Sequence, residues 1–181
     1  ISNIGTKVSY DGGNTNQFLP TKLSLGTGLL YPLDDYNQIA FYVDLSKYLV
    51  PTAPIQTGST AEEIEEYNKK YEEYNNMSPI TGIFKSFGDS PNGFKGELEE
   101  IMASIGLEYN YNEQFFVRGG YYYENKYQGN RQYFSVGAGF RMSVFQLDAA
   151  YLISTVQSNP LDQTLRFSLS FDMDGIRNLF R

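Results

Sequence analysis

The sequence predicts an all-β protein: an antiparallel up-and-down transmembrane β-barrel with about eight strands in this chain and a helical extracellular loop. Three observations predict it, namely alternating apolar and polar residues, alternating long and short connections, and aromatic residues grouped at the strand ends. The 181 residues are only 41% hydrophobic and contain no run of apolar residues long enough for a transmembrane helix. A barrel strand needs apolar residues only at alternate positions, so this composition is compatible with a membrane.

The alternation defines the strands and their two faces. Every second residue from Phe134 to Met142 is apolar, and the pattern resumes at Phe145 after a slip of one residue. The predicted strands are residues 1–10, 21–33, 38–50, 97–112, 115–125, 132–143, 144–155 and 164–173. Charged residues on the polar face are candidates for lining a lumen: Asp44, Glu108, Arg118, Arg141, Asp148, Arg166 and Asp172. Alternation alone leaves open a soluble barrel with an apolar interior.

The connections and the aromatic residues favour the membrane barrel. In an up-and-down sheet alternate connections leave the same end, so all long connections here lie at one end, as in outer-membrane barrels. Strands of about 10–12 residues match a tilted bilayer crossing. Aromatic residues are grouped near the tight-turn end (Tyr31, Tyr36, Tyr109, Tyr111, Phe115, Phe140, Phe145 and Phe171) and near the long-loop end (Tyr10, Tyr48, Tyr121, Tyr123, Tyr133 and Phe134). Two such belts are typical of a bilayer-spanning protein.

The longest connection, about residues 51–96, is predicted to be helical. Thr60 and Glu63 form a capping-box pattern at the start of one helix, and Pro79 suits the first turn of a second helix. Candidate partner-binding residues in this loop are Tyr67, Tyr71, Tyr74, Ile80, Ile83, Phe84 and Phe87. The alternatives are that the tyrosines pack on the loop or the barrel rim. The apolar face of the second helix has three possible contacts: lipid, the barrel mouth or a ligand.

The sequence contains no motif for catalysis. It has no histidine and no cysteine, which removes most metal sites and the common nucleophile–base pairs. No nucleophile elbow and no phosphate-binding loop is present. The net charge of -7 disfavours nucleic acid as a partner. We therefore expect a protein that is not an enzyme and that has no catalytic residues, no metal and no cofactor.

Two long stretches resemble one family of outer-membrane proteins. FLPTKLSLGTGLLYPLDDYNQIAFYVDLSKYLVPT (residues 18–52) and LRFSLSFDMDGIRNLFR (residues 165–181) resemble the PorV (LptO) family of the type IX secretion system in Bacteroidetes. That family is similar in architecture to FadL-like barrels of 14 strands. The resemblance implies that residues 1–181 are the C-terminal portion of a single barrel, starting partway through a protein, with the insertion of about 51–96 as an extracellular loop. The implied location is the cell outer membrane of a Gram-negative bacterium.

The resemblance also implies a function. Members of the family shuttle secreted cargo proteins, recognised by a C-terminal signal domain, from the SprA (Sov) translocon to the PorU attachment complex at the cell surface. Membrane lipid and lipopolysaccharide are then further partners. The alternative is a FadL-like outer-membrane channel for hydrophobic small molecules. A soluble lipid-binding barrel is a third possibility.

Overall fold

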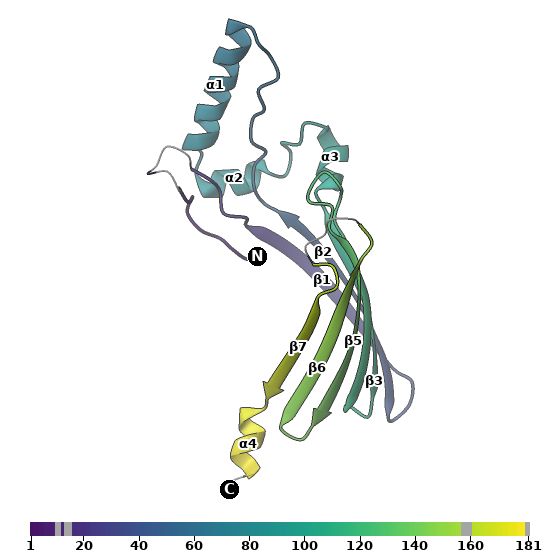
Figure 1. Cartoon of the computed structure of the whole chain (residues 1–181). Coiled ribbons are helices and arrows are strands. Elements are labelled where there is room, and N and C mark those ends of the chain that lie inside the picture. Colours follow the sequence, from purple (N-terminus) through teal and green to yellow (C-terminus); the bar gives the residue numbers. More distant parts are fainter. Residues whose placement is uncertain (10–11, 13–15, 157–160, 180–181) are drawn as a thin grey trace. The chain divides into compact units, whose positions relative to one another are not determined.

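One β-sheet of seven strands dominates the described residues of the chain. The computed structural model describes residues 1–9, 12, 16–156 and 161–179 (Figure 1). The strands are β1 (Lys22–Pro32), β2 (Asn37–Tyr48), β3 (Met102–Tyr111), β4 (Phe115–Tyr123), β5 (Gln132–Met142), β6 (Phe145–Ser154) and β7 (Leu165–Phe171). They follow one another across the sheet in chain order, and the ladders from β3 to β7 are antiparallel. The predicted antiparallel up-and-down sheet is confirmed.

The predicted alternation of short and long connections is also confirmed. Residues 33–36, 112–114 and 143–144 make the short turns after β1, β3 and β5. Asn112, Glu113 and Ser143 have positive φ angles of 52°, 54° and 48°, as tight hairpin turns require. In the first turn, the carboxylate of Asp34 accepts backbone N–H bonds from Tyr36 (2.9 Å) and Asn37 (2.8 Å). Because alternate connections share an end, these three turns lie at one end of the sheet.

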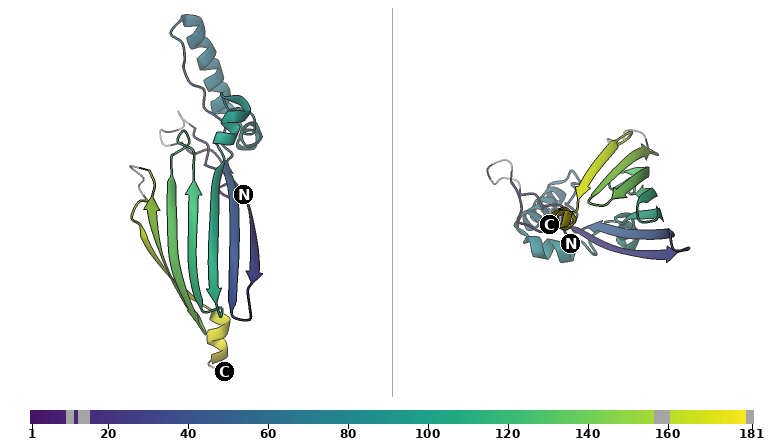
Figure 2. Two further views of the ribbon diagram at one scale, coloured as in Figure 1. Left: turned by 90° about the vertical axis from the view of Figure 1, so that its right-hand side faces the viewer. Right: turned by 90° about the horizontal axis from the view of Figure 1, so that it is seen from below.

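The sheet is open in the described residues. Its edge strands β1 and β7 do not pair with each other, and Figure 2 shows the sheet curving without closing. A closed barrel is therefore not formed by the described strands alone. Closure requires further strands, or pairing between β1 and β7 that the described residues lack.

The strand predicted for residues 1–10 is wrong, so the described sheet has seven strands, not the eight predicted. This segment makes only isolated bridges, Ser2 to Lys22 and Val8 to Gln17. Asn3 has a φ of 57°, in the left-handed region, which interrupts an extended run. Tyr10, predicted to join an aromatic belt, lies outside the described residues.

Four helices are present in the described chain, of which two were predicted. The predicted helices are α1 (Ala61–Asn76), with its capping box of Thr60 and Glu63, and α2 (Pro79–Lys85). The sequence did not predict α3 (Gly93–Glu99), so the strand expected from residue 97 begins at Met102. Nor did it predict α4 (Met173–Leu179), before which β7 ends at Phe171. Both are only seven residues long, and α3 has no side-chain cap, so neither leaves a clear sequence signal. None of the described helices has the length and apolar character needed to cross a membrane.

The chain divides into two compact units. Residues 1–24 and 46–101, with α1, α2 and α3, make the helical unit. Residues 25–45 and 102–181 make the sheet unit, which includes α4. Each unit has its own internal contacts.

The apolar face of the sheet is uncovered in the described structure. Phe167, Leu169 and Phe171 are 69%, 58% and 58% exposed, and Val136 in the middle of β5 is 50% exposed. Four apolar side chains of the sheet unit are buried: Ala40, Met102, Phe116 and Leu152. They lie on the polar face, because each is an even number of residues from a polar-face residue of its own strand or stands opposite one in the neighbouring strand. An exposed apolar surface of this extent requires a partner or lipid.

Aromatic rings meet at both ends of the sheet. Near the short turns, the ring of Phe140 lies 5.0 Å from that of Phe115 and 6.3 Å from that of Phe145. Toward the other end, Tyr121 and Phe134 lie 4.7 Å apart. The predicted grouping of aromatic residues is confirmed for these rings.

Candidate functional site

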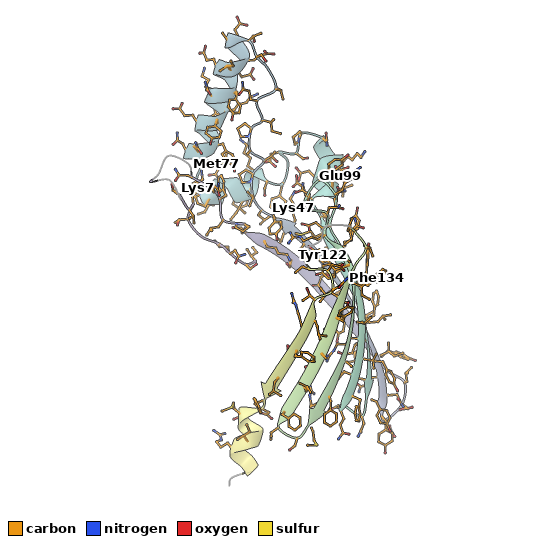
Figure 3. All side chains as sticks on the ribbon, in the orientation of Figure 1. Lys7, Lys47, Met77, Glu99, Tyr122 and Phe134 are labelled. Carbon is orange, nitrogen blue, oxygen red and sulfur yellow. The ribbon has the colours of Figure 1, made fainter. Side chains whose placement is uncertain are left out.

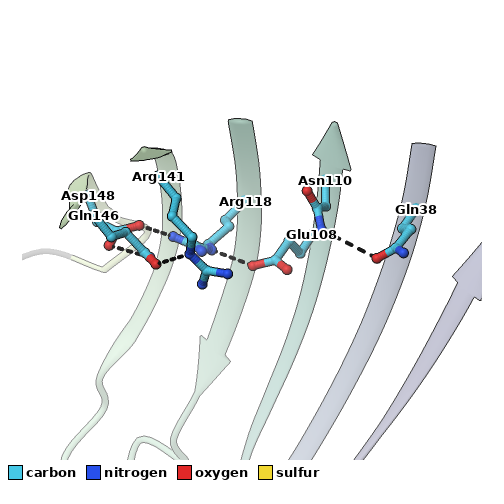
Figure 4. A network of polar contacts seen from close by, with 7 residues as sticks. All are labelled: Gln38, Glu108, Asn110, Arg118, Arg141, Gln146 and Asp148. Carbon is cyan, nitrogen blue, oxygen red and sulfur yellow. Dashed lines mark hydrogen bonds and ion pairs between the residues drawn. The ribbon is translucent and has the colours of Figure 1, made fainter. Parts of the chain in front are cut away.

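The polar face of the sheet holds a network centred on Arg118 of β4 (Figure 4). Glu108 of β3 is directly opposite Arg118 in the ladder, and its carboxylate accepts a bond from the guanidinium Nε. A second guanidinium nitrogen, Nη1, donates to Asp148 of β6. One arginine therefore connects three strands, and it skips β5 to do so. Charge-assisted bonds of this kind are the stronger class of hydrogen bond.

Glycine in β5 makes that crossing possible. Gly139 is the ladder partner of both Phe116 and Asp148, so it lies between β4 and β6 under the arginine. A Cβ atom at Gly139 would meet the Asp148 carboxylate and lie 3.1 Å from Nη1 of Arg118. Any side chain here would compete with the ion pair for the same space. Gly139 therefore leaves the space that the Arg118–Asp148 pair occupies.

Phe116 and Gln146 complete the network. Phe116 is 5% exposed, and its ring centroid lies 5.0 Å from the Arg118 guanidinium and 5.1 Å from that of Arg141. Gln146 accepts a bond from Arg141 (2.9 Å) and donates one to Asp148 (2.7 Å). Two arginines and two carboxylates thus balance one another, so the network as a whole carries no net charge.

The candidate lumen residues are brought together in part. Glu108, Arg118, Arg141 and Asp148 share the network, and Asp44 lines an open hollow of about 240 Å³ with Glu108 and Arg118. Arg166 is on the same face of β7, opposite Ala150, and makes no ion pair in the described structure. Asp172 lies beyond the end of β7, where its carboxylate accepts a bond from the backbone N–H of Asp174 at the start of α4. The sequence missed Phe116, although an aromatic residue on the polar face is a visible break in alternation.

In the helical unit, the three tyrosines predicted on α1 form a stripe along one side of the helix, spaced three or four residues apart. Tyr67 and Tyr71 stack with ring centroids 5.8 Å apart. Tyr74 makes an edge contact with Phe18 at 5.2 Å, and burial raises the pKa of this tyrosine. α1 has no buried side chain, so most of the helix surface is free for other contacts.

Lys7 holds the C-terminal end of α1 (Figure 3). Its ammonium donates to the carbonyl oxygens of Tyr74 (2.8 Å) and Asn75 (2.9 Å) and lies 4.0 Å from the ring centroid of Phe18. The last turn of α1 has no basic residue of its own, so Lys7 supplies the positive charge that a helix C-terminus favours. Desolvation by burial lowers the pKa of Lys7. The segment that was predicted to be a strand therefore anchors a helix.

A second ion cluster lies in the helical unit around Lys47. Its ammonium contacts the carboxylates of Glu97 and Glu100, the latter at 2.8 Å. Glu97 also accepts the backbone N–H of Ser90 at 3.0 Å. Burial acts to raise the pKa of Glu97, but the bonds from Lys47 and Ser90 outweigh it and hold the pKa below its usual value. The cluster attaches α3 to the end of β2.

The apolar residues predicted on α2 are mostly uncovered. Ile80, Phe84 and Phe87 are 68%, 74% and 52% exposed, whereas Ile83 is half-buried. In the described residues, no group of three or more acidic, histidine or cysteine side chains is placed to hold a metal ion. The arrangement of the helical unit offers binding surfaces of aromatic, aliphatic and acidic side chains.

Comparison with known proteins gives one family. A model of the family described as Type IX secretion system protein PorV matches residues 1–55, which is less than a third of the chain. No curated protein matches the chain significantly. The family match supports the resemblance to PorV that the sequence predicted.

Proposed function

We propose that this chain is part of a non-enzymatic outer-membrane barrel of the type IX secretion system, which binds secreted cargo proteins and passes them to the cell surface. The single observation that carries the proposal is the match of the PorV family model to residues 1–55. SprA (Sov), PorU and the cargo C-terminal domains are its proposed protein partners.

The exposed apolar face of the sheet supports the membrane part of the proposal. Residues such as Val136 and Phe167 are uncovered, while on the other face Glu108 and Asp148 pair with Arg118. In a lipid bilayer the uncovered face contacts acyl chains, and the paired charges face a polar interior. Further strands outside this chain, or pairing of β1 with β7, close the barrel.

Neighbouring substitutions on the two faces of β5 test the membrane part. Val136→Arg places a charge toward lipid and Ser135→Arg places the same charge on the polar face. A charge toward the bilayer midplane costs about 2–4 kcal/mol. We expect the Val136 variant to be lost from the outer-membrane fraction and the Ser135 variant to be retained there. Equal recovery of both variants from the soluble fraction would contradict the proposal.

The helical unit supports the partner-binding part, because its predicted contact residues are accessible. A triple variant, Ile80→Ser with Phe84→Ser and Phe87→Ser, removes the uncovered apolar side chains of α2 and of the segment directly after it. In the native host we expect cargo to be retained in the periplasm and to be absent from the cell surface. Phe94→Ser, at a residue that is 78% exposed in α3, is the matched control.

Folding must be measured in the same cells. Protease shaving of whole cells and heat-dependent migration in gels report whether the variant barrel is assembled. Normal cargo export by an assembled triple variant would count against a role for this surface. Export lost equally in the Phe94 control would mean that the unit had merely unfolded.

A further inference from the structure

The surface of α1 contains a patch whose charge is not balanced within the chain. Asn68 is exposed and lies three or four residues from Ile64, Glu65, Tyr71 and Glu72, so the four side chains surround it on the helix surface. These five residues are called the Asn68 face. It combines one aliphatic side chain, one aromatic ring, one amide and two carboxylates.

The two carboxylates of the Asn68 face have no cation within the described structure. Glu65 and Lys69 lie four residues apart on the helix but form no ion pair in the described structure, whereas Glu66 and Lys70 do, at 2.7 Å. α1 as a whole has six glutamates and two lysines, a net charge of -4. The helix therefore has unpaired negative charge beside the partly exposed ring of Tyr71, and positive charge on a partner would complement it.

The molecule already shows how this helix accommodates a cation. At the last turn of α1, the ammonium of Lys7 lies among the rings of Phe18 and Tyr74, 4.0 Å and 5.6 Å from their centroids. Tyr71 lies one turn earlier in the helix, beside Glu72, and has no cation over its ring in the described residues. An arginine or lysine from outside would find there an aromatic face and a carboxylate together.

We propose that the Asn68 face docks a protein segment rich in arginine or lysine. This deepens the proposed function and rests on it, because it names the chemistry of the partner that the helical unit binds. Aromatic anchors surrounded by charge are typical of protein interfaces, and the unpaired glutamates select a basic partner. A surface rich in anionic lipid is disfavoured as the occupant, since it would be repelled by the net charge of α1.

Charge reversals on two faces of α1 test the proposal. Glu65→Lys with Glu72→Lys reverses the Asn68 face, and Glu62→Lys with Glu73→Lys makes the same charge change on the neighbouring face, away from Asn68 and Tyr71. The probe is a fluorescent 12-residue peptide with four arginines spaced by glycine and serine, and an aspartate version is its counterpart. Binding to the detergent-solubilised full chain is followed by fluorescence anisotropy at low and high salt.

We expect the arginine peptide to bind, and its affinity to fall as the salt concentration is raised. The Asn68-face double variant should lose about tenfold or more in affinity, and the neighbouring-face variant should stay within about threefold. Asn68→Arg is a second variant that places a cation between the two glutamates without weakening the helix, because arginine has the higher helix propensity. It should also lose about tenfold.

Several results would overturn the proposal. Equal losses in the two double variants would mean that only net charge matters. Equal binding of the aspartate peptide, or no binding of the arginine peptide, would remove the basic partner. Dimerisation or vesicle binding that is lost only in the Asn68-face variant would assign the surface to a second copy or to lipid.

Secretion assays separate this failure from failure of the proposed function. If the α2 triple variant stops cargo export while both charge-reversal variants export normally, the docking surface on α1 is wrong and the secretion function stands. If all the variants assemble normally and none of them changes cargo export, the proposed secretion function itself is wrong.

Discussion

Two clusters in this protein place one cation between two carboxylates, and they differ in burial and in origin. In the sheet unit, Arg118 lies between Glu108 and Asp148, and its side chain is 36% exposed. In the helical unit, Lys47 lies between Glu97 and Glu100, and its side chain is only 11% exposed. The sheet cluster joins β3, β4 and β6 within one sheet, whereas the Lys47 cluster joins residues separated by most of the long connection.

The difference in burial indicates how strongly each cluster depends on its cation. Charges that lose water depend more strongly on their partners, so the Lys47 cluster should be the more sensitive to loss of its cation. The Arg118 cluster is supported by strand pairing on every side, so its loss should cost less.

Lys47→Met should have the largest local effect. It leaves two carboxylates unpaired in a mostly buried site, and we expect the free energy of opening α3 to fall by about 2–3 kcal/mol. Amide hydrogen exchange of residues 90–100 measures this. Lys70→Met is the control, because the Glu66–Lys70 pair is well exposed and its loss should leave the protection of residues 90–100 unchanged. Equal protection in the two variants would show that the cluster does not hold α3.

Arg118→Met should destabilise the sheet by a smaller amount. Glu108 and Asp148 lose their shared cation, but both are partly accessible and Asp148 keeps its bond from Gln146. We expect a decrease of about 1–2 kcal/mol in the free energy of unfolding, measured by urea titration in detergent. Arg118→Lys should recover only part of it, since an ammonium cannot reproduce the fork of a guanidinium. Full recovery with lysine would argue against the three-strand geometry.

The sheet cluster was largely predictable and the helical one was not. Alternation places Glu108, Arg118, Arg141 and Asp148 on one face, and tight turns fix which residues stand opposite, so their proximity follows from local rules. Lys47 and Glu97 meet only because α3 forms, and that helix is too short and uncapped to be recognised. The same reason explains the error at residues 1–10, where the contact of Lys7 with α1 depends on a fold that no local pattern encodes.

The sequence also could not decide whether the apolar face of the sheet is covered by protein or turns toward lipid. A period of two is the same in a soluble barrel and in a membrane barrel, so strand pattern alone leaves the direction of Val136 undecided. The alternating connection lengths favoured the membrane barrel, and turn residues such as Asn112 and Ser143 are readable locally. The structure adds that Phe167 and its neighbours meet no other layer in the described residues.

Gly139→Ala should weaken the sheet by about 1 kcal/mol, because the added methyl group displaces the Arg118–Asp148 contact. Gly119→Ala is the matched control, since a Cβ there meets nothing within 4 Å. Urea titration of both variants, and of Gly139→Ala combined with Arg118→Met, makes a double-mutant cycle. The double variant should cost less than the sum of the two single changes, because both act on one ion pair. Strict additivity would separate Gly139 from the arginine.

The smallest effect should come from acidification of the Lys47 cluster. The pKa of Glu97 lies below its ordinary value of 4.5, because the bonds from Lys47 and Ser90 outweigh its partial burial. A carboxylate with a lowered pKa in the folded state stabilises it above the unfolded pKa, and that stabilisation disappears as the pH falls through the folded pKa. Protection of α3 in the unmodified chain should therefore exceed that in Glu97→Gln at pH 7, and the difference should shrink below about pH 4.5. Hydrogen exchange at several pH values, corrected for intrinsic rates, measures it. A difference that stays constant down to pH 3 would mean that the amide satisfies the same contacts, and that the charge of Glu97 does not distinguish this cluster from the one around Arg118.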